Sequence, residues 1–487
     1  MKVACREEES QILERIYTSN KSELLAIYGR RRIGKTYLIR EFFEKKAGIF
    51  FNVTGSKDGS YKKQIEHFTQ RIGEIFLGGI QLKVGSNWDE TFKLLTEAIN
   101  KISKKKKVVL FFDELPWMAT QKSKLLQTLD HYWNQYWSMD KRIKLIICGS
   151  SASWIIEKII NNKGGLHNRV TETIYLQPFT LAQTERYLAL NKVKLNHKQM
   201  TEIYMVTGGV PYYLSKVEPG LSAAQIIEKL AFKPKALLLD EFDNLFSSLF
   251  EDSDAYIEII KIIAKYRSGI GQESLFKLLK KTAKGNMGLI RLKALEDAGF
   301  IISFTPQFHK RRGIFYRVID EYTLFYLYWI APLKETQMSR ALAQGYWKTL
   351  TQTPKWFSWA GYAFEAVCYK HLNQIRQALD LLPSAIPNAW RYIPKNKGKN
   401  ATLGAQIDLL FDRQDGCITM CEIKYTSKAY TLDKQDAEIL ENKVKVFQQQ
   451  TRTKKQIFIA MIVSDSIKEN EYYQKLVSRV IHLSDFF

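Results

Sequence analysis

One short segment near the amino terminus limits the folds open to this chain more than any other. Residues 29–36 read Gly-Arg-Arg-Arg-Ile-Gly-Lys-Thr, after an apolar run at 24–28 and before a helix-favouring run at 37–42. The glycines let backbone N–H groups curl around phosphate groups, the lysine reaches the outer phosphates, and the threonine hydroxyl can hold Mg²⁺. A glycine-flanked turn in a basic surface loop is the alternative. The order of strand, loop and helix favours an α/β core with a parallel sheet that binds a nucleoside triphosphate. The residues expected to contact it here are Gly29, Arg30, Arg31, Arg32, Ile33, Gly34, Lys35, Thr36 and Tyr37.

Two acids end the next strongly apolar run. Residues 108–112 are Val-Val-Leu-Phe-Phe, and Asp113 and Glu114 follow them directly. Because the carboxyl ends of parallel strands line the ligand crevice, we expect both carboxylates to reach the phosphate site. Asp113 would hold Mg²⁺ together with Thr36, and Glu114 would polarise the attacking water as a catalytic residue.

Polar residues accompany two further strand-like runs. The run at 144–148 leads into Ser150, which would contact the γ-phosphate; a turn with helix-capping serines explains the same residues equally well. Arg169 precedes a run at 173–176. This arginine would neutralise charge in the transition state, in its own subunit or in a neighbour's, or it is a solvated surface residue.

Together these motifs resemble the archaeal-type ATPases, in the signal-transducing branch of the AAA+-like P-loop proteins. The resemblance extends to residues 6–9, Arg-Glu-Glu-Glu, and to residues 208–212, Gly-Gly-Val-Pro-Tyr. It implies that Arg6 lies near the nucleotide, with Cys5 where the family often has glycine. It also implies that Pro211 belongs to a helical lid that packs over the base. Without the resemblance, the sequence of residues 208–212 indicates only a turn and the start of a helix.

The middle of the chain has the pattern of a winged helix. Helical runs at 257–263, 274–279 and 288–299 precede two strand-like runs at 300–304 and 313–318. Such a module can place a helix in the DNA major groove while its wing meets phosphates, and winged helices equally serve as spacers or protein-binding modules. The aromatic run that follows, at 320–332, has the spacing of a helix core rather than of a base-stacking platform. The expected DNA contacts are Arg291, Lys293, Lys310, Arg311 and Arg312.

The last 150 or so residues contain the parts of a metal-dependent phosphodiesterase site. Glu365 lies on a predicted helix, Asp408 on a strand, and Glu422 and Lys424 on the next strand beyond a turn at 415–416. Asp408 and Glu422 would bind Mg²⁺ or Mn²⁺, and Lys424 would steady the water or the phosphate. The pattern resembles the PD-(D/E)xK nuclease fold, with Ile407 where some members have proline. Charged residues on an exposed strand face are the alternative, and some folds of this kind are inert.

Charge and cysteine content limit the partners and the compartment. The 487 residues carry a formal charge of +23, which suggests a polyanionic partner, although lysine-rich surfaces also serve solubility. The sequence shows no run long enough to span a bilayer and no signal peptide, and its five cysteines follow no disulfide framework. We therefore expect a cytoplasmic protein with reduced thiols.

These observations predict four parts. They are a P-loop ATPase core over 1–176, a helical lid over 177–250, a winged helix over 251–335 and a restriction-endonuclease-like α/β domain over 336–487. The function expected is a Mg²⁺-dependent ATPase that acts as a switch on DNA, in defence or DNA processing, and that can form homo-oligomers. The alternative is a non-catalytic, ATP-driven signalling or scaffold protein whose last domain only binds.

Overall fold

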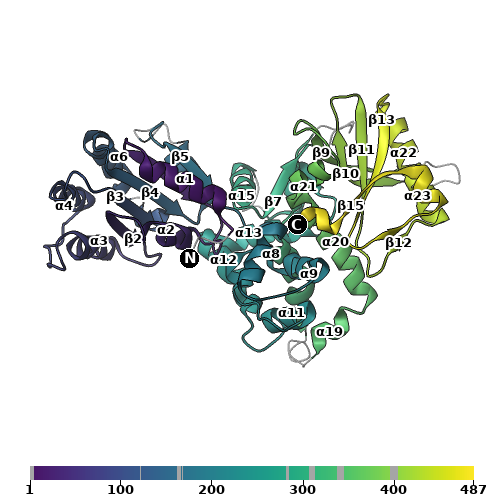
Figure 1. Cartoon of the computed structure of the whole chain (residues 1–487), viewed down its shortest axis with the longest axis horizontal. Helices are drawn as coiled ribbons and strands as arrows, with labels where there is room; N and C mark the ends of the chain where they lie inside the picture. Colours follow the sequence, from purple (N-terminus) through teal and green to yellow (C-terminus); the bar gives the residue numbers. More distant parts are fainter. Residues whose placement is uncertain are drawn as a thin grey trace. The chain divides into compact units, whose positions relative to one another are not determined.

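The computed structural model describes residues 5–120, 122–161, 166, 168–280, 285–305, 313–336, 345–394 and 404–487, with the backbone only at 335 and 336. Its contacts divide the chain into two compact units, Met1–Pro178 and Phe179–Phe487 (Figure 1). Each unit is considered by itself below. No described helix is both long enough and apolar enough to cross a bilayer.

The first unit contains a five-stranded parallel sheet in the order β2-β3-β4-β1-β5. This confirms the predicted α/β core. The strand that precedes the phosphate loop, β1, is separated from the acid-bearing strand β3 by β4. All three strands end at the same edge of the sheet, because they are parallel. The strands are β1 (Glu23–Tyr28), β2 (Ile49–Thr54), β3 (Val108–Asp113), β4 (Ile143–Gly149) and β5 (Glu172–Tyr175).

Helices cover both faces of this sheet, so its central strands are apolar along their whole length. Alternate residues of β1 enter different cores: Leu24 and Ala26 join one, and Leu25 and Ile27 the other. The second core includes residues of α1 and α2. The helical segments of this unit are α1 (Glu7–Thr18), α2 (Lys35–Phe43), α3 (Tyr61–Phe76), α4 (Trp88–Asn100), α5 (Leu115–Met118), α6 (Leu125–Gln135), η1 (Trp137–Met139), α7 (Ala152–Ile155) and η2 (Ile156–Ile160).

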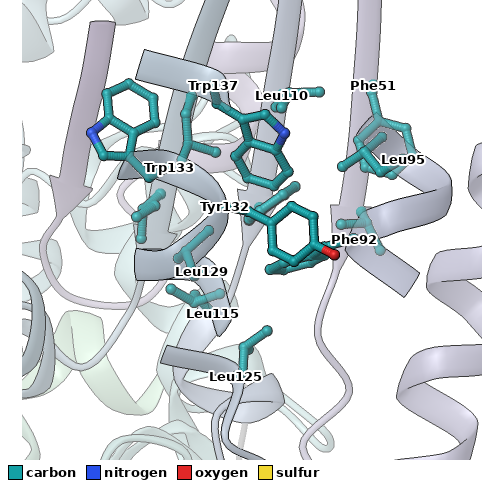
Figure 2. Packing of buried hydrophobic residues seen from close by; sticks show 14 of the residues in the cluster. Phe51, Phe92, Leu95, Leu110, Leu115, Leu125, Leu129, Tyr132, Trp133 and Trp137 are labelled. Carbon is teal, nitrogen blue, oxygen red and sulfur yellow. The ribbon is translucent and has the colours of Figure 1, made fainter. Parts of the chain in front are cut away.

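Aromatic side chains fill the core between the sheet and the helices α3, α4 and α6 (Figure 2). The ring of Phe92 is fully buried, and its centroid lies 5.4 Å from Trp137, 5.7 Å from Tyr132 and 6.0 Å from Phe112. Stacked, tilted and edge-on rings at such distances attract one another beyond the area that they bury. This core holds the acid-bearing strand β3 in a fixed position.

The second unit begins with helices, as its sequence pattern indicates. Gly208 and Gly209 end the second helix, both with positive φ. A Cβ on Gly209 would lie 2.1 Å from the carbonyl oxygen of Phe179, so only glycine fits at this turn. The helices are α8 (Leu181–Leu190), α9 (His197–Thr207), α10 (Pro211–Leu214), α11 (Ala223–Ala231) and α12 (Leu237–Leu249).

Three helices and a small antiparallel sheet follow, with the strand order β6-β8-β7. The sequence pattern indicates the three helices and the two longer strands but not the two-residue strand β6. The predicted DNA contacts Lys310, Arg311 and Arg312 lie outside the described residues. We call residues 253–318 the middle module. Its elements are α13 (Ser253–Ala264), β6 (Ile270–Gly271), α14 (Gln272–Leu278), α15 (Gly285–Asp297), β7 (Ile301–Phe304) and β8 (Phe315–Val318).

The aromatic run after the middle module is core, as predicted. Tyr322, Phe325 and Trp329 are buried, and the ring of Phe325 lies 5.5 Å from that of Trp347. Trp347 in turn stacks on Phe232, the residue that directly follows α11. The run is therefore not available as a base-stacking platform. Its elements are α16 (Glu321–Phe325), η4 (Tyr326–Ile330), α17 (Ala331–Thr336) and α19 (Tyr346–Leu350).

The chain ends in a mixed five-stranded sheet with the order β15-β13-β11-β10-β9. The strands β9, β10 and β11 are antiparallel neighbours, whereas β11, β13 and β15 run parallel. A bulge interrupts the pairing of β10 with β9 between Ile407 and Leu410, next to Asp408. The elements are α20 (Pro354–Lys370), α21 (Leu372–Ala378), β9 (Ile386–Tyr392), β10 (Ala405–Asp412), β11 (Cys417–Lys424), β12 (Tyr430–Thr431), α22 (Lys434–Thr451), β13 (Gln456–Val463), β14 (Ile467–Lys468), α23 (Glu471–Leu476), β15 (Val477–His482) and η5 (Leu483–Phe486).

Candidate functional site

The loop between β1 and α2 has the backbone conformation that a phosphate cradle needs. Gly29 and Gly34 have φ values of 142° and 90°, which side chains rarely tolerate. A Cβ on Gly29 would lie 2.3 Å from the carbonyl oxygen of Leu176, so this position accepts only glycine. Beside Gly34, by contrast, a Cβ would meet no atom of the described residues within 4 Å. The loop is thus held on one side and open at the start of α2.

Lys35 is buried at the centre of this loop. Its Nζ donates to the carbonyl oxygens of Gly29 and Arg30 at 2.7 and 3.0 Å, and to Oγ of Ser150 at 3.1 Å. These three bonds hold the ammonium group between the end of β1 and the end of β4. A positive charge fixed there suits an anion that enters over the loop.

Asp113 lies beside the first turn of α2. Its Oδ2 accepts hydrogen bonds from the hydroxyls of Thr36 and Thr54, at 2.9 and 3.4 Å. Its Oδ1 is buried without a hydrogen-bond partner among the described residues. An unsatisfied carboxylate oxygen next to a threonine hydroxyl provides the hard oxygen ligands that Mg²⁺ prefers, so these residues fit the predicted ion.

Glu114 begins α5 in a left-handed conformation, with φ of 49°. Both of its carboxylate oxygens bind Ser150: Oε2 accepts the backbone N–H at 3.0 Å, and Oε1 accepts the hydroxyl. Ser150 therefore links Lys35 to Glu114, which it can do because β4 lies between β1 and β3. Among the described residues, the hydroxyl of Ser150 caps no helix, and the side chain of Ser151 makes no capping bond at the start of α7. The helix-capping alternative for these serines is therefore not what the structure has.

Arg6 supports the phosphate loop from the amino-terminal segment. Its Nη2 donates to the carbonyl oxygens of Ile33 and Gln177, at 3.3 and 2.7 Å. Burial lowers the pKa of this guanidinium, and the ion pair with Glu9 opposes that change. Cys5 has φ of 62°, a conformation typical of glycine, which gives a physical reason for the glycine that the resembled family often has here.

The other loop residues differ in exposure. Arg30 is buried, Arg31 and Arg32 are half-buried, and Ile33 packs in the core beneath the loop. Tyr37 is 58% exposed on the first turn of α2. Pro211 belongs to the second unit, where it is the first residue of α10.

Arg169 lies at the opposite edge of the sheet from the phosphate loop. The backbone N–H of the nearby Thr171 bonds to the carbonyl of Leu24, at the amino end of β1. The loop follows the carboxyl end of that strand, about 20 Å away for a strand of this length. The exposed Arg169 is therefore not part of the nucleotide site of its own chain.

In the second unit, Asp408 and Glu422 lie on one face of the last sheet. Leu409 pairs with Cys421 across the antiparallel strands β10 and β11. The adjacent residues Asp408 and Glu422 are therefore opposite each other in this register. Burial, followed by the nearby Glu365 and Glu422, raises the pKa of Asp408 to about 7. Asp408 also accepts a hydrogen bond from Nε2 of Gln406 at 3.1 Å.

Each of the other acids is already paired with a cation. Glu422 binds Nζ of Lys443 at 2.6 Å and of Lys424 at 3.2 Å. Glu365 binds Nη2 of Arg317 at 2.7 Å. Among the described residues, no three His, Cys, Asp or Glu side chains are arranged to hold a metal ion. The residues therefore do not fit a divalent ion in this arrangement, and the metal site remains a prediction.

The two predicted DNA contacts on α15 that the structure describes are both engaged. Arg291 is buried and forms an ion pair with Asp252, and Nζ of Lys293 lies 2.9 Å from Asp297. Arg291 is therefore not positioned to meet a groove, because its own module surrounds it. Three apolar side chains of the helix, those of Met287, Leu289 and Ile290, are exposed alongside Lys293.

Sequence reasoning missed four residues around these two sites. Thr54 was detectable, since it is a polar residue that ends an apolar strand-like run in a parallel sheet. Arg317 and Lys443 gave no local signal, because each meets its acid from an element distant in the sequence. Tyr369 gave no local signal either; its hydroxyl donates to the backbone carbonyl of Asp408 at 2.7 Å.

Comparison with known proteins gives a consistent result for the first unit. Residues 4–217 match the family model described as "ATPase domain predominantly from Archaea". The chain is 51% identical over 49 residues to the uncharacterized ATP-binding protein MJ0423 of Methanocaldococcus jannaschii, which covers 9% of this chain and 83% of that protein. It is 25% identical over 375 residues to the uncharacterized protein MJECL04 of the same organism, covering 76% and 77% of the two chains.

Two solved structures are also similar. The Walker-type ATPase paby2304 of Pyrococcus abyssi matches 66% of this chain and 95% of its own, with 18% identity and a TM-score of 0.45. The ORC2 protein of Aeropyrum pernix, solved as ADPNP–ADP complexes, matches 69% and 96%, with 16% identity and a TM-score of 0.42.

Proposed function

We propose that this chain is a Mg²⁺-dependent ATP-hydrolysing switch that acts on DNA, and the match of residues 4–217 to the family of ATPase domains predominantly from Archaea supports the ATPase part. The setting would be defence against foreign DNA or its processing. The observation that carries the ATPase part is the chain of contacts from Lys35 through Ser150 to Glu114, beside the unsatisfied oxygen of Asp113.

The residues of the nucleotide site have different proposed roles in hydrolysis. Lys35 would exchange its bonds to the loop carbonyls for phosphate oxygens. Thr36 and Asp113 would hold Mg²⁺, which would supply positive charge to offset the charge that develops on the phosphates. Glu114 orients the attacking water and accepts its proton. Ser150 reports whether the outer phosphate is present, because the same hydroxyl contacts both Lys35 and Glu114.

Three further residues have proposed roles at the nucleotide. Arg6 and Tyr37 would border the bound nucleotide, and Pro211 would close over the base from the helical lid. Arg169 would reach the nucleotide of a neighbouring copy, since it lies far from its own.

The action on DNA is proposed for the second unit. The middle module has the element order of a winged helix, and the net charge of +23 suits a polyanion. The last domain has Asp408 and Glu422 on one sheet face, as the resemblance to PD-(D/E)xK nucleases implies. Asp408 and Glu422 would bind Mg²⁺ or Mn²⁺, Lys424 would steady the water or the phosphate, and Glu365 would be a further catalytic residue in the cleavage of phosphodiester bonds.

Specific observations favour a second candidate, a non-catalytic signalling or scaffold protein. The acids Glu365 and Glu422 are held by Arg317, Lys424 and Lys443. Three apolar side chains of α15, those of Met287, Leu289 and Ile290, are exposed, which suits a protein partner better than a phosphate backbone. In this function the last domain binds without cutting.

Two variants separate these functions. In Lys35→Ala, we expect ATP affinity to fall roughly 10- to 150-fold, because a hydrogen bond to a charged group contributes about 1.5–3 kcal/mol. In Asp408→Ala, we expect ATP turnover to persist and cleavage of DNA with Mg²⁺ or Mn²⁺ to vanish. Unchanged ATP affinity in Lys35→Ala would refute the loop assignment. Failure of the wild type to cut any DNA or RNA would favour the scaffold.

A further inference from the structure

A cavity of about 230 Å³ lies between the middle module and the last domain, both within the second unit. One wall comes from the strands of the middle module, with Phe304, Phe315 and Arg317. The other comes from the last domain, with Glu365 and Asp408. The predicted carboxylate site therefore opens into a space that the middle module covers.

Arg317 of β8 is the buried cation of this cavity, which the exposed Arg391 also lines. It is 3% exposed, and its Nη2 bonds to Oε2 of Glu365 at 2.7 Å. Its guanidinium carbon lies 4.6 Å from the ring centroid of Tyr369 and 5.7 Å from that of Tyr362. Its Nε is buried without a hydrogen-bond partner among the described residues. The side chain is thus held by aromatic rings and one carboxylate, with donor capacity left unused.

The charges around the cavity explain why a cation is needed. Glu365, Asp408 and Glu422 are close enough for the first and the last to raise the pKa of Asp408. Buried like charges repel strongly unless a cation lies among them. Lys443 and Lys424 neutralise Glu422, so Arg317 is the partner that the structure gives to Glu365.

We propose that Arg317 holds the carboxylate site closed to metal, and that the site binds a divalent cation only when the middle module moves away from the last domain. This inference rests on the proposed nuclease-like role of the last domain and adds its regulation. A guanidinium and a divalent ion compete for the same carboxylate, since Glu365 cannot neutralise both at once. Further contacts would have to break, among them Arg391 with Ser268, Asn388 with the carbonyl of Thr305, and Arg267 with the ring of Tyr362.

The test is Mn²⁺ binding to the full chain without nucleotide, measured by electron paramagnetic resonance. An Asp113→Asn background removes any contribution from the first unit. We expect Arg317→Met, which keeps the volume and removes the charge, to bind Mn²⁺ at least tenfold more tightly than the background chain. Arg317→Lys should keep the weak binding, because it keeps the cation. Adding Asp408→Asn to Arg317→Met should abolish the gain.

Arg413→Met is the matched control, because Arg413 is also a paired arginine in the unit but binds Asp415 on the surface. It should leave Mn²⁺ affinity unchanged. Equal Mn²⁺ affinity in Arg317→Met and in the background chain, with both folded by circular dichroism, would overturn the proposal. So would an equal gain in Arg413→Met.

A second measurement keeps Arg317 in place. In this chain, saturating Mn²⁺ should speed amide hydrogen exchange in β8 and β9 at least threefold, because the ion binds only when the middle module moves away from the last domain. Unchanged exchange at saturation would also overturn the proposal. If Arg317→Met gains the metal but cuts no DNA, closure by Arg317 stands and the nuclease proposal fails. If the wild type cuts DNA and Arg317→Met gains no metal, the opposite holds.

Discussion

At the scale of single residues, Ser150 connects the two charged groups on which hydrolysis depends. Its hydroxyl accepts from Lys35 and donates to Glu114, and its N–H also binds Glu114. These bonds hold the carboxylate of Glu114 at the end of β3, where a strained backbone conformation has already placed it. The orientation of Glu114 therefore depends on a residue of the neighbouring strand.

We expect Ser150→Ala to lower ATP turnover roughly 10- to 100-fold while ATP affinity changes less than threefold. Glu114, the general base, loses its bond to the Ser150 hydroxyl and keeps only the bond to the backbone N–H, whereas Lys35 keeps its bonds to the loop carbonyls. Turnover and nucleotide affinity measured on the same preparation check this. Ser151→Ala is the control, since the Ser151 side chain makes no capping bond. A loss of affinity as large as the loss of turnover would show that Ser150 acts in binding instead.

Single residues also show how far the sequence determines the site. Gly29, Lys35, Thr36 and Asp113 could be predicted, because each follows or ends an apolar run with the spacing that phosphate chemistry requires. The partner of Glu365 could not. Arg317 is 48 residues away, and only the packing of the middle module on the last domain brings the two together.

At the scale of elements, the buried His371 joins the start of the lid to the last domain. Its Nε2 accepts the backbone N–H of Leu181, at the start of α8, at 3.0 Å. Its Nδ1 bonds to the carbonyl of Val367, at the end of α20, at 2.8 Å. Nε2 accepts only when it carries no proton, so burial and this bond both require the neutral imidazole. Burial lowers the pKa of His371 to about 4.

This shift predicts a loss of stability in acid. Between pH 4 and 6.5 the unfolded chain, with a His pKa near 6.5, binds a proton at this residue and the folded chain does not. The contribution of the neutral His371 to the free energy of unfolding is therefore complete above about pH 6.5. As the pH falls from 6.5 to 4, the free energy of unfolding should drop by about 1.4 kcal/mol per pH unit from this residue. Urea unfolding at pH 7 and pH 5 measures the drop.

The matched variant for this measurement is His371→Gln, whose amide cannot titrate. It should be less stable than the wild type at pH 7, and its further loss at pH 5 should be smaller than that of the wild type. Other acids titrate in both chains, so the difference between the chains isolates the histidine. Equal losses in the two chains would contradict the role assigned to His371.

The elements themselves were predictable to different degrees. The strands β1, β3 and β4 follow from unbroken apolar runs, because a parallel sheet covered on both faces needs them. The strand β6 has two residues, too few for any periodicity to appear. The position of Arg169, by contrast, could be inferred from the sequence, since a residue that precedes a strand of a parallel sheet lies at the strand's amino end, opposite the loop.

At the scale of the whole molecule, the position of Arg169 determines whether it can act at the nucleotide site of its own chain or only at that of a second copy. A sheet length of about 20 Å separates it from its own phosphate loop. If Arg169 neutralises transition-state charge, it does so at the nucleotide of a second copy. The specific ATPase activity of the wild type should then rise with protein concentration, because the complete site forms only between copies.

We expect Arg169→Ala to lose at least tenfold in ATP turnover at high protein concentration, where wild-type sites are complete, with ATP affinity kept. Glu114→Gln should be inactive by a different route, because it keeps Arg169 and loses the base. An equimolar mixture of the two variants should recover activity, since some interfaces then pair an intact Glu114 with an intact Arg169 from the other copy. Arg479→Ala, which removes another exposed arginine, should leave turnover unchanged. A wild type with concentration-independent turnover, or a mixture no more active than its components, would return Arg169 to the role of a solvated surface residue.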